Sequence, residues 1–198
     1  MAKRVFFTFD YRDLIYRDLI EGRVEAVRQQ LASSGYGSLG FFEPSAWAHA
    51  RGTGDAALMR MIDTGLARTA VTCALVGSEA YRDAGVRYAL MRSYRRGNAL
   101  IVVHINHVKD RKGGIKPTGP NPLAYLGVSY SENGESANLW EMDEEEWKPY
   151  TNVDGKATYQ TGGIMAQYWG KSFTLSQWYP EHNWVADDGP RNFERWVG

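Results

Sequence analysis

The chain has 198 residues, of which 43% are hydrophobic, and its 23 Lys and Arg residues balance 23 Asp and Glu residues. Zero net charge excludes binding to nucleic acid or to anionic membranes through bulk charge, and the single Cys73 excludes an internal disulfide. No stretch reaches the roughly 18 apolar residues that span a bilayer, and the basic start lacks a signal-peptide pattern. We therefore expect a cytoplasmic protein that binds neither nucleic acid nor membrane.

Strands alternate with helices along residues 1–130, a pattern typical of a parallel sheet. The expected strands are residues 4–9, 40–42, 69–76, 100–105 and 125–129. The expected helices start near residues 13, 54 and 83 and end near residues 31, 66 and 96. Residues 43–47 and 109–122 are expected to be loops. The sequence therefore predicts an α/β fold with a flavodoxin-like, doubly wound parallel sheet.

The pattern changes after residue 130. Six of the seven tryptophans and an acidic run at residues 143–146 interrupt a weakly periodic sequence. So aromatic a segment is not expected to be disordered. We expect two parts, a sheet domain at residues 1–130 and a C-terminal extension at residues 131–198 that packs on it, over the site.

Several common kinds of binding site are excluded because the sequence lacks their motifs. Neither a G-x-G-x-x-G after the first strand nor a G-x-x-x-x-G-K-[ST] is present. His104, Asn106 and His107 end a strand, but no carboxylate or cysteine in that segment completes a ligand set, so a metal site is not expected. The polar turn after the first strand is where an open α/β sheet places its ligand.

An ordered set of segments resembles the TIR-like domain family of the Thoeris anti-phage defence protein ThsB. The matching segments are VFFTFDY at 5–11, RDL at 12–14, Ser45-Ala46-Trp47, Asp55, residues 57–81, residues 86–106, GPNPLAYLG at 119–127 and WKPY at 147–150. The resemblance covers most of residues 3–130.

This resemblance implies an enzyme that cleaves NAD+ as its substrate, without a further cofactor, at the bond between nicotinamide and ribose. The product would be a cyclic ADP-ribose isomer or an ADP-ribose conjugate that activates a separate ThsA-type effector. A phage structural protein would be the trigger, and the domain would self-associate as TIR domains do.

The resemblance also implies a catalytic glutamate where this chain has Ala89, in Val86-Arg87-Tyr88-Ala89. Cleavage passes through an oxocarbenium-like centre that a carboxylate stabilises. Alanine preserves a helix and removes the carboxylate. We therefore hypothesise that the chain is an inactive variant, with engineered substitution favoured over a natural pseudoenzyme because the surrounding segments match.

Six further residues are candidates for substrate contact. They are Phe9, Asp10, Tyr11, Trp47, Ser78 and Glu79. The aspartate could instead cap the following helix, the tryptophan could be packed in its loop, and the glutamate could simply begin a turn.

Three other functions are alternatives. A non-catalytic TIR scaffold that acts by self-association fits Ala89 directly. A response-regulator receiver would need a phosphoacceptor aspartate where the chain has Gly77-Ser78-Glu79. A nucleoside deoxyribosyltransferase breaks the same class of bond and stays open.

Overall fold

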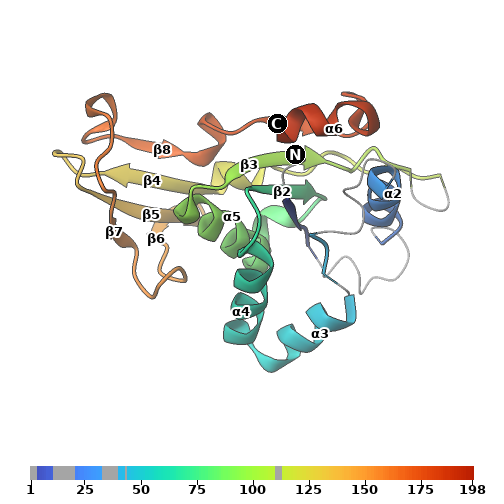
Figure 1. Cartoon of the computed structure of the whole chain (residues 1–198), viewed down its shortest axis with the longest axis horizontal. Coiled ribbons are helices and arrows are strands. Elements are labelled where there is room, and N and C mark those ends of the chain that lie inside the picture. Colours follow the sequence, from blue (N-terminus) through green and yellow to red (C-terminus); the bar gives the residue numbers. More distant parts are fainter. Residues whose placement is uncertain (1–3, 11–20, 33–39, 43, 110–112) are drawn as a thin grey trace.

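A parallel sheet of four strands forms the centre of the molecule. β1 (Val5–Thr8), β2 (Val71–Val76) and β3 (Ala99–His104) are neighbours in that order, and β9 (Glu181–Asn183) pairs with β3 at the far edge. The computed structural model (Figure 1) describes residues 4–10, 21–32, 40–42, 44–109 and 113–198.

The central strands form because their side chains are apolar on both faces. Every residue of β1 and β2 is buried, as expected for a parallel sheet that is covered by helices on its two sides. The predicted strands at 4–9, 69–76 and 100–105 are thus confirmed, each within a few residues of its expected bounds.

Helices flank both faces of this sheet. α5 (Ala84–Arg96) contacts all three central strands, and α4 (Asp55–Leu66) packs against α5. α6 (Gly189–Val197) contacts β3 from the opposite side, with α2 (Glu21–Ala32) beside it (Figure 1). This is the mixed α/β, flavodoxin-like arrangement that the sequence predicted.

The start and end of α5 follow ordinary capping rules. The Asp83 carboxylate accepts a hydrogen bond from the Val86 backbone N–H at 3.0 Å, and Gly97 ends the helix with a left-handed φ of 75°. These caps explain why this helix matches its predicted bounds so closely.

A second, antiparallel sheet lies beside the first (Figure 1). Its path is β6-β5-β4-β8, with β7 also paired to β5. The bounds are β4 (Leu126–Tyr130), β5 (Ser136–Asp143), β6 (Glu146–Pro149), β7 (Thr158–Gln160) and β8 (Ser172–Thr174). Short 3-10 turns are η1 (Ala80–Arg82), η2 (Pro122–Tyr125), η3 (Ala166–Tyr168) and η4 (Leu175–Gln177).

Three predictions for individual segments were wrong. Residues 40–42 form no strand, because Gly40 has a φ of 95° and its carbonyl accepts one bond, from the Phe7 N–H at 2.9 Å. The expected loop at 43–47 overlaps a helix, α3 (Pro44–Thr53). The expected fifth parallel strand is β4 of the antiparallel sheet, because it pairs with the neighbouring β5.

Both sheets take strands from both sides of residue 130. β9 completes the parallel sheet, and β4 lies inside the antiparallel one. A single hydrophobic core runs from Phe7 of β1 to Leu139 of β5. The division into parts at residues 1–130 and 131–198 stays a prediction. Across the described ranges, no helix is both long and apolar enough to cross a membrane.

Candidate active site at the carboxyl ends of the parallel strands

Three polar side chains follow the three neighbouring parallel strands at one edge of the sheet. Asp10 lies just beyond β1, Ser78 just beyond β2 and Asn106 just beyond β3. The register pairs Thr8 with Ala74 and Val76 with His104, which brings these strand ends to similar levels. The Asn106 Nδ2 lies 3.5 Å from the Ser78 Oγ. This edge is where open α/β sheets bind ligands.

A loop crosses this edge and fixes Asn106. The Asn106 carbonyl accepts a hydrogen bond from the Lys116 N–H at 2.9 Å, and its side-chain Oδ1 lies 3.5 Å from the Gly119 N. A Cβ on Gly119 would lie 2.2 Å from the Gly77 carbonyl oxygen, so only glycine permits this approach. Asn106 therefore contacts the backbone of this loop through both its carbonyl and its side chain, and it is 2% exposed.

The sequence pattern suggested Asn106 only as a metal ligand. Its position, as a polar residue just after a buried strand, is a stronger indication that it belongs to the candidate site. The neighbouring histidines are paired with groups near β9. His104 Nε2 lies 2.6 Å from Glu181 Oε1, and His107 Nδ1 lies 3.3 Å from Asn183 Nδ2. Among the described residues, no three His, Cys, Asp or Glu side chains gather as a metal site would require.

Arg23 brings α2 to the same edge. Its side chain is buried, with Nε donating to the Val108 carbonyl at 2.6 Å and Nη2 donating to the Gly114 carbonyl at 2.9 Å. A buried guanidinium normally requires such partners. The sequence did not single out this residue, because the helical apolar stripe passes through the next position, Val24, and not through Arg23.

The candidates after β1 have different environments. Asp10 is 3% exposed, so a carboxyl group is buried at the edge. The Phe9 ring is also buried, and its centroid lies 6.2 Å from that of Phe41, so it contributes to the core. Tyr11 lies outside the described residues. Of the two described residues, Asp10 is the one that places a polar group at these strand ends.

Ser78 and Glu79, which follow β2, also have different environments. Ser78 is partly buried beside Asn106, whereas Glu79 is exposed and its Oε2 lies 3.3 Å from Arg82 Nη1. The structure thus brings Ser78 to Asn106, while Glu79 has a cation partner on the following turn.

Trp47 is packed inside the molecule. The ring is 3% exposed, and a Cβ on Gly85 would lie 2.7 Å from it. The Phe42 ring centroid lies 6.4 Å away. Stacking on a ligand would require this indole to leave its present packing against α5.

Ala89 lies on the buried side of α5 and has 0% exposure. Ser93, one turn further along the helix, places its Oγ 2.7 Å from Thr72 Oγ1 on β2, so this side of α5 faces the sheet. Helical side chains lean toward the helix N-terminus, and α5 begins on the side of the candidate site. A longer side chain at position 89 would therefore point toward that edge from within the core.

The neighbouring Tyr88 serves the structure of this helix pair. Burial, and then the nearby Asp63 carboxylate, raise the pKa of Tyr88 to about 12. Its hydroxyl lies 3.1 Å from both Asp63 carboxylate oxygens. The phenol thus stays neutral and donates from α5 to α4.

Comparison with known proteins identifies the family. The family model described as Thoeris protein ThsB, TIR-like domain, matches residues 6–110. Over 199 aligned residues, covering 100% of both chains, the sequence is 41% identical to a protein of Bacillus cereus (strain MSX-D12) named "Putative cyclic ADP-D-ribose synthase ThsB1". With a family model that matches more than half of its residues and a relative that is 41% identical over its full length, the chain belongs to the ThsB TIR-like domain family.

Proposed function

We propose that the fold is that of an NAD-cleaving enzyme that produces an ADP-ribose-derived signal, cyclic or conjugated, in anti-phage defence. The observation that supports this most directly is that Asp10, Ser78 and Asn106 follow three neighbouring parallel strands at their carboxyl ends, with Ser78 and Asn106 3.5 Å apart. The family and the synthase named among its relatives agree with it.

The proposed reaction breaks the bond between the nicotinamide nitrogen and the ribose carbon. The bonding electron pair stays on the ring nitrogen, which neutralises the pyridinium, so the leaving group requires no proton. The ribose carbon becomes oxocarbenium-like, and a carboxylate close to it is stabilising. The proposed source of that charge is the glutamate whose place Ala89 takes, while Asp10, Ser78 and Asn106 supply hydrogen-bonding groups for the ribose hydroxyls.

The nature of the product depends on the group that attacks the ribose carbon. A nitrogen or hydroxyl of the same ADP-ribose unit gives a cyclic isomer, and another molecule gives a conjugate. The signal would act on a ThsA-type effector, and a phage structural protein would trigger its synthesis. Self-association of the chain belongs to the same proposal, and all of these rest on family membership.

We further propose that this chain is inactive because Ala89 replaces the catalytic glutamate. The lean of side chains on α5 toward the candidate site supports a role for a carboxylate at this position. Its complete burial means that such a carboxylate would be desolvated.

Nicotinamide release tests the proposal. The chain and its Ala89→Glu variant are incubated with NAD, with and without lysate of phage-infected cells, and Ala89→Gln provides a control of equal size without charge. We expect both the chain and the glutamate variant to bind NAD, and only the glutamate variant to release nicotinamide.

Each other outcome has a definite meaning. Turnover by the unchanged chain would show that Ala89 is compatible with catalysis and would leave Asp10 as the carboxylate. Concentration-dependent assembly without any NAD binding would replace the enzyme with the self-associating scaffold. A circular dichroism spectrum of each variant shows whether the charge in the core has disturbed the fold.

A further inference from the structure

A cleft of about 360 Å³ lies on the antiparallel sheet, away from the candidate active site. Its lining residues come from four strands and one turn: Gly127, Val128, Trp140, Trp147, Ser172, Phe173, Thr174 and Gln177. In β4 and β5, Tyr130 and Glu141 bond to α5, so Gly127 and its cross-strand partner Trp140 face the opposite side. The cleft is therefore on the sheet face that α5 does not cover.

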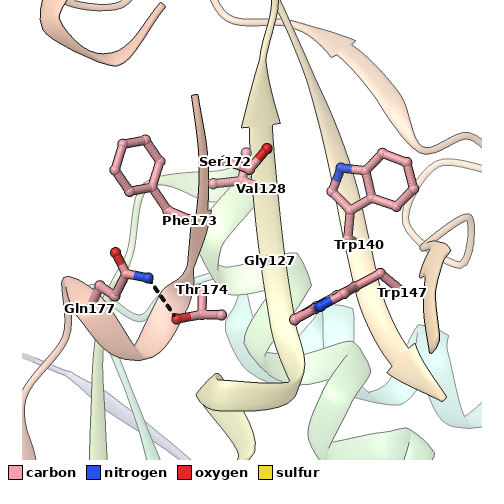
Figure 2. A pocket seen from close by; sticks show the side chains of 8 residues that line it. All are labelled: Gly127, Val128, Trp140, Trp147, Ser172, Phe173, Thr174 and Gln177. Carbon is pink, nitrogen blue, oxygen red and sulfur yellow. Dashed lines mark hydrogen bonds between the residues drawn. The ribbon is translucent and has the colours of Figure 1, made fainter. Parts of the chain in front are cut away.

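Two indole rings form one wall of this cleft. Figure 2 shows Trp140 and Trp147 on one side of β4, with Thr174 and Gln177 on the other. Trp140 Nε1 donates to Ser129 Oγ at 2.8 Å, which fixes that ring. Trp147 is 41% exposed, although it is a large aromatic side chain. Exposed indole faces favour stacking with a flat ring.

The floor of the cleft is the backbone of Gly127. A Cβ at this position would lie 3.2 Å from the Trp147 ring and 3.1 Å from the Phe173 carbonyl oxygen. The missing side chain therefore lets the edge of the Trp147 ring lie close to the backbone of β4.

The polar groups of the lining are uncharged. None of the lining residues is ionisable, so a phosphate or carboxylate would find no counter-charge there. Gln177 Nε2 donates to Thr174 Oγ1 at 3.2 Å (Figure 2), which orients the amide. Its Oε1 and its second N–H proton have no partner among the described residues, so the amide presents an acceptor and a donor together.

We propose that this cleft binds an uncharged, planar, single-ring heteroaromatic carboxamide. Its ring stacks on Trp147, and its amide pairs with that of Gln177. A sugar is less suited, because it would bring a hydroxyl on most ring carbons to a wall that offers only Ser172, Thr174 and Gln177. Nicotinamide is the member of this class that the proposed reaction would release, and only this choice of ligand rests on the proposed function.

Direct binding to the full chain, without NAD, tests this inference. Nicotinamide is titrated while the indole N–H signals are followed by NMR, with each signal assigned from the matching tryptophan substitution. A Kd on the order of 1 mM is expected for so small a ligand. The Trp140 and Trp147 signals should shift saturably, and those of Trp184 and Trp196 should not.

Matched variants locate the ligand. Trp147→Ala should weaken binding about tenfold, whereas Trp169→Ala should leave it unchanged, because Trp169 is similarly exposed, at 43%, but lies outside the cleft. Gln177→Leu should weaken nicotinamide binding and reduce the preference for nicotinamide over pyridine. Nicotinate, which is charged, should bind more weakly than nicotinamide.

Three results would overturn the inference. They are no saturable shift of the Trp140 and Trp147 signals, equal binding by the Trp147→Ala variant, and shifts caused by ribose but not by nicotinamide, which would indicate a sugar site. Since no turnover is measured, each of these results leaves the nicotinamide-release experiment untouched, and failure of that experiment leaves this one interpretable.

Discussion

Arg87 on α5 and Glu141 on β5 form an ion pair, with 2.8 Å between Nη1 and Oε2, that joins the two sheets of the molecule. The side chains are 12% and 25% exposed, and Arg87 Nε also donates to the Tyr81 carbonyl at 2.8 Å. The helix that covers the parallel sheet is thus fastened to a strand of the antiparallel sheet through a largely desolvated contact.

Removing one partner of this pair should be costly. Arg87→Met is expected to lower the free energy of unfolding by about 2 kcal/mol, because the hydrogen bonds to a charged group are lost and Glu141 remains partly buried. Urea denaturation measures the change. Arg82→Met provides the control, since its pair with Glu79 is exposed and should contribute less than about 1 kcal/mol. Equal effects of the two substitutions would contradict this reasoning.

The hydroxyl pair of Thr72 and Ser93 joins β2 to α5. Both residues have 0% exposure, and their oxygens lie 2.7 Å apart. Ser93→Ala should destabilise the fold by about 1–2 kcal/mol, because the Thr72 hydroxyl loses its partner in the core. Adding Thr72→Val should recover part of that loss. A double variant that is less stable than Ser93→Ala alone would argue that packing, not hydrogen bonding, is the main contribution.

Gly119 holds its loop against the candidate active site. Gly119→Ala should push the loop off the Gly77 carbonyl, since the contact would be 2.2 Å. We expect a loss of about 1–3 kcal/mol in the free energy of unfolding and weaker NAD binding, measured by denaturation and calorimetry. Gly52→Ala is the matched control, because Gly52 lies in α3 with open space around it and should gain up to about 1 kcal/mol.

The environment of His182 should make the folded state less stable in acid. Its ring stacks on Trp196 with centroids 4.2 Å apart, and burial lowers its pKa, partly opposed by Asp187, while Arg195 lowers it further. Below the ordinary histidine pKa of about 6.5, the unfolded chain binds more protons than the folded one, so stability falls as the pH falls.

Thermal unfolding between pH 7 and pH 5 measures this effect. His182→Phe keeps a ring against Trp196 and should make the fall in melting temperature less steep. His49→Phe, at an exposed position on α3, should keep the original slope. If both variants behave like the unchanged chain, other groups are responsible for the acid dependence.

The parallel sheet was predictable because its information is local. β2 is six buried, mostly β-branched or apolar residues, and α5 has a cap at each end. β9 could not be found in this way. Its residues, Glu181-His182-Asn183, have little strand preference, and they are extended because β3 offers them an unpaired edge.

The sequence also contains a pattern that indicates the antiparallel sheet. Asn133-Gly134 stands between β4 and β5, a dipeptide typical of hairpin turns, and buried residues alternate along the first half of β5. At the candidate site, the sequence predicted that residues at the ends of β1 and β2 would take part. Arg23 and Gly119 contact residues that are far away in the chain, and no local pattern reveals such contacts.

The position of β9 has a consequence for synthesis. Because residues 181–183 complete a sheet that residues 5–8 begin, a nascent chain cannot finish that sheet until residue 183 has left the ribosome. Such distant pairing slows folding, and until β9 arrives the outer edge of β3 is open to other strands. The growing polypeptide therefore exposes an open strand edge while the residues between β3 and β9 are made.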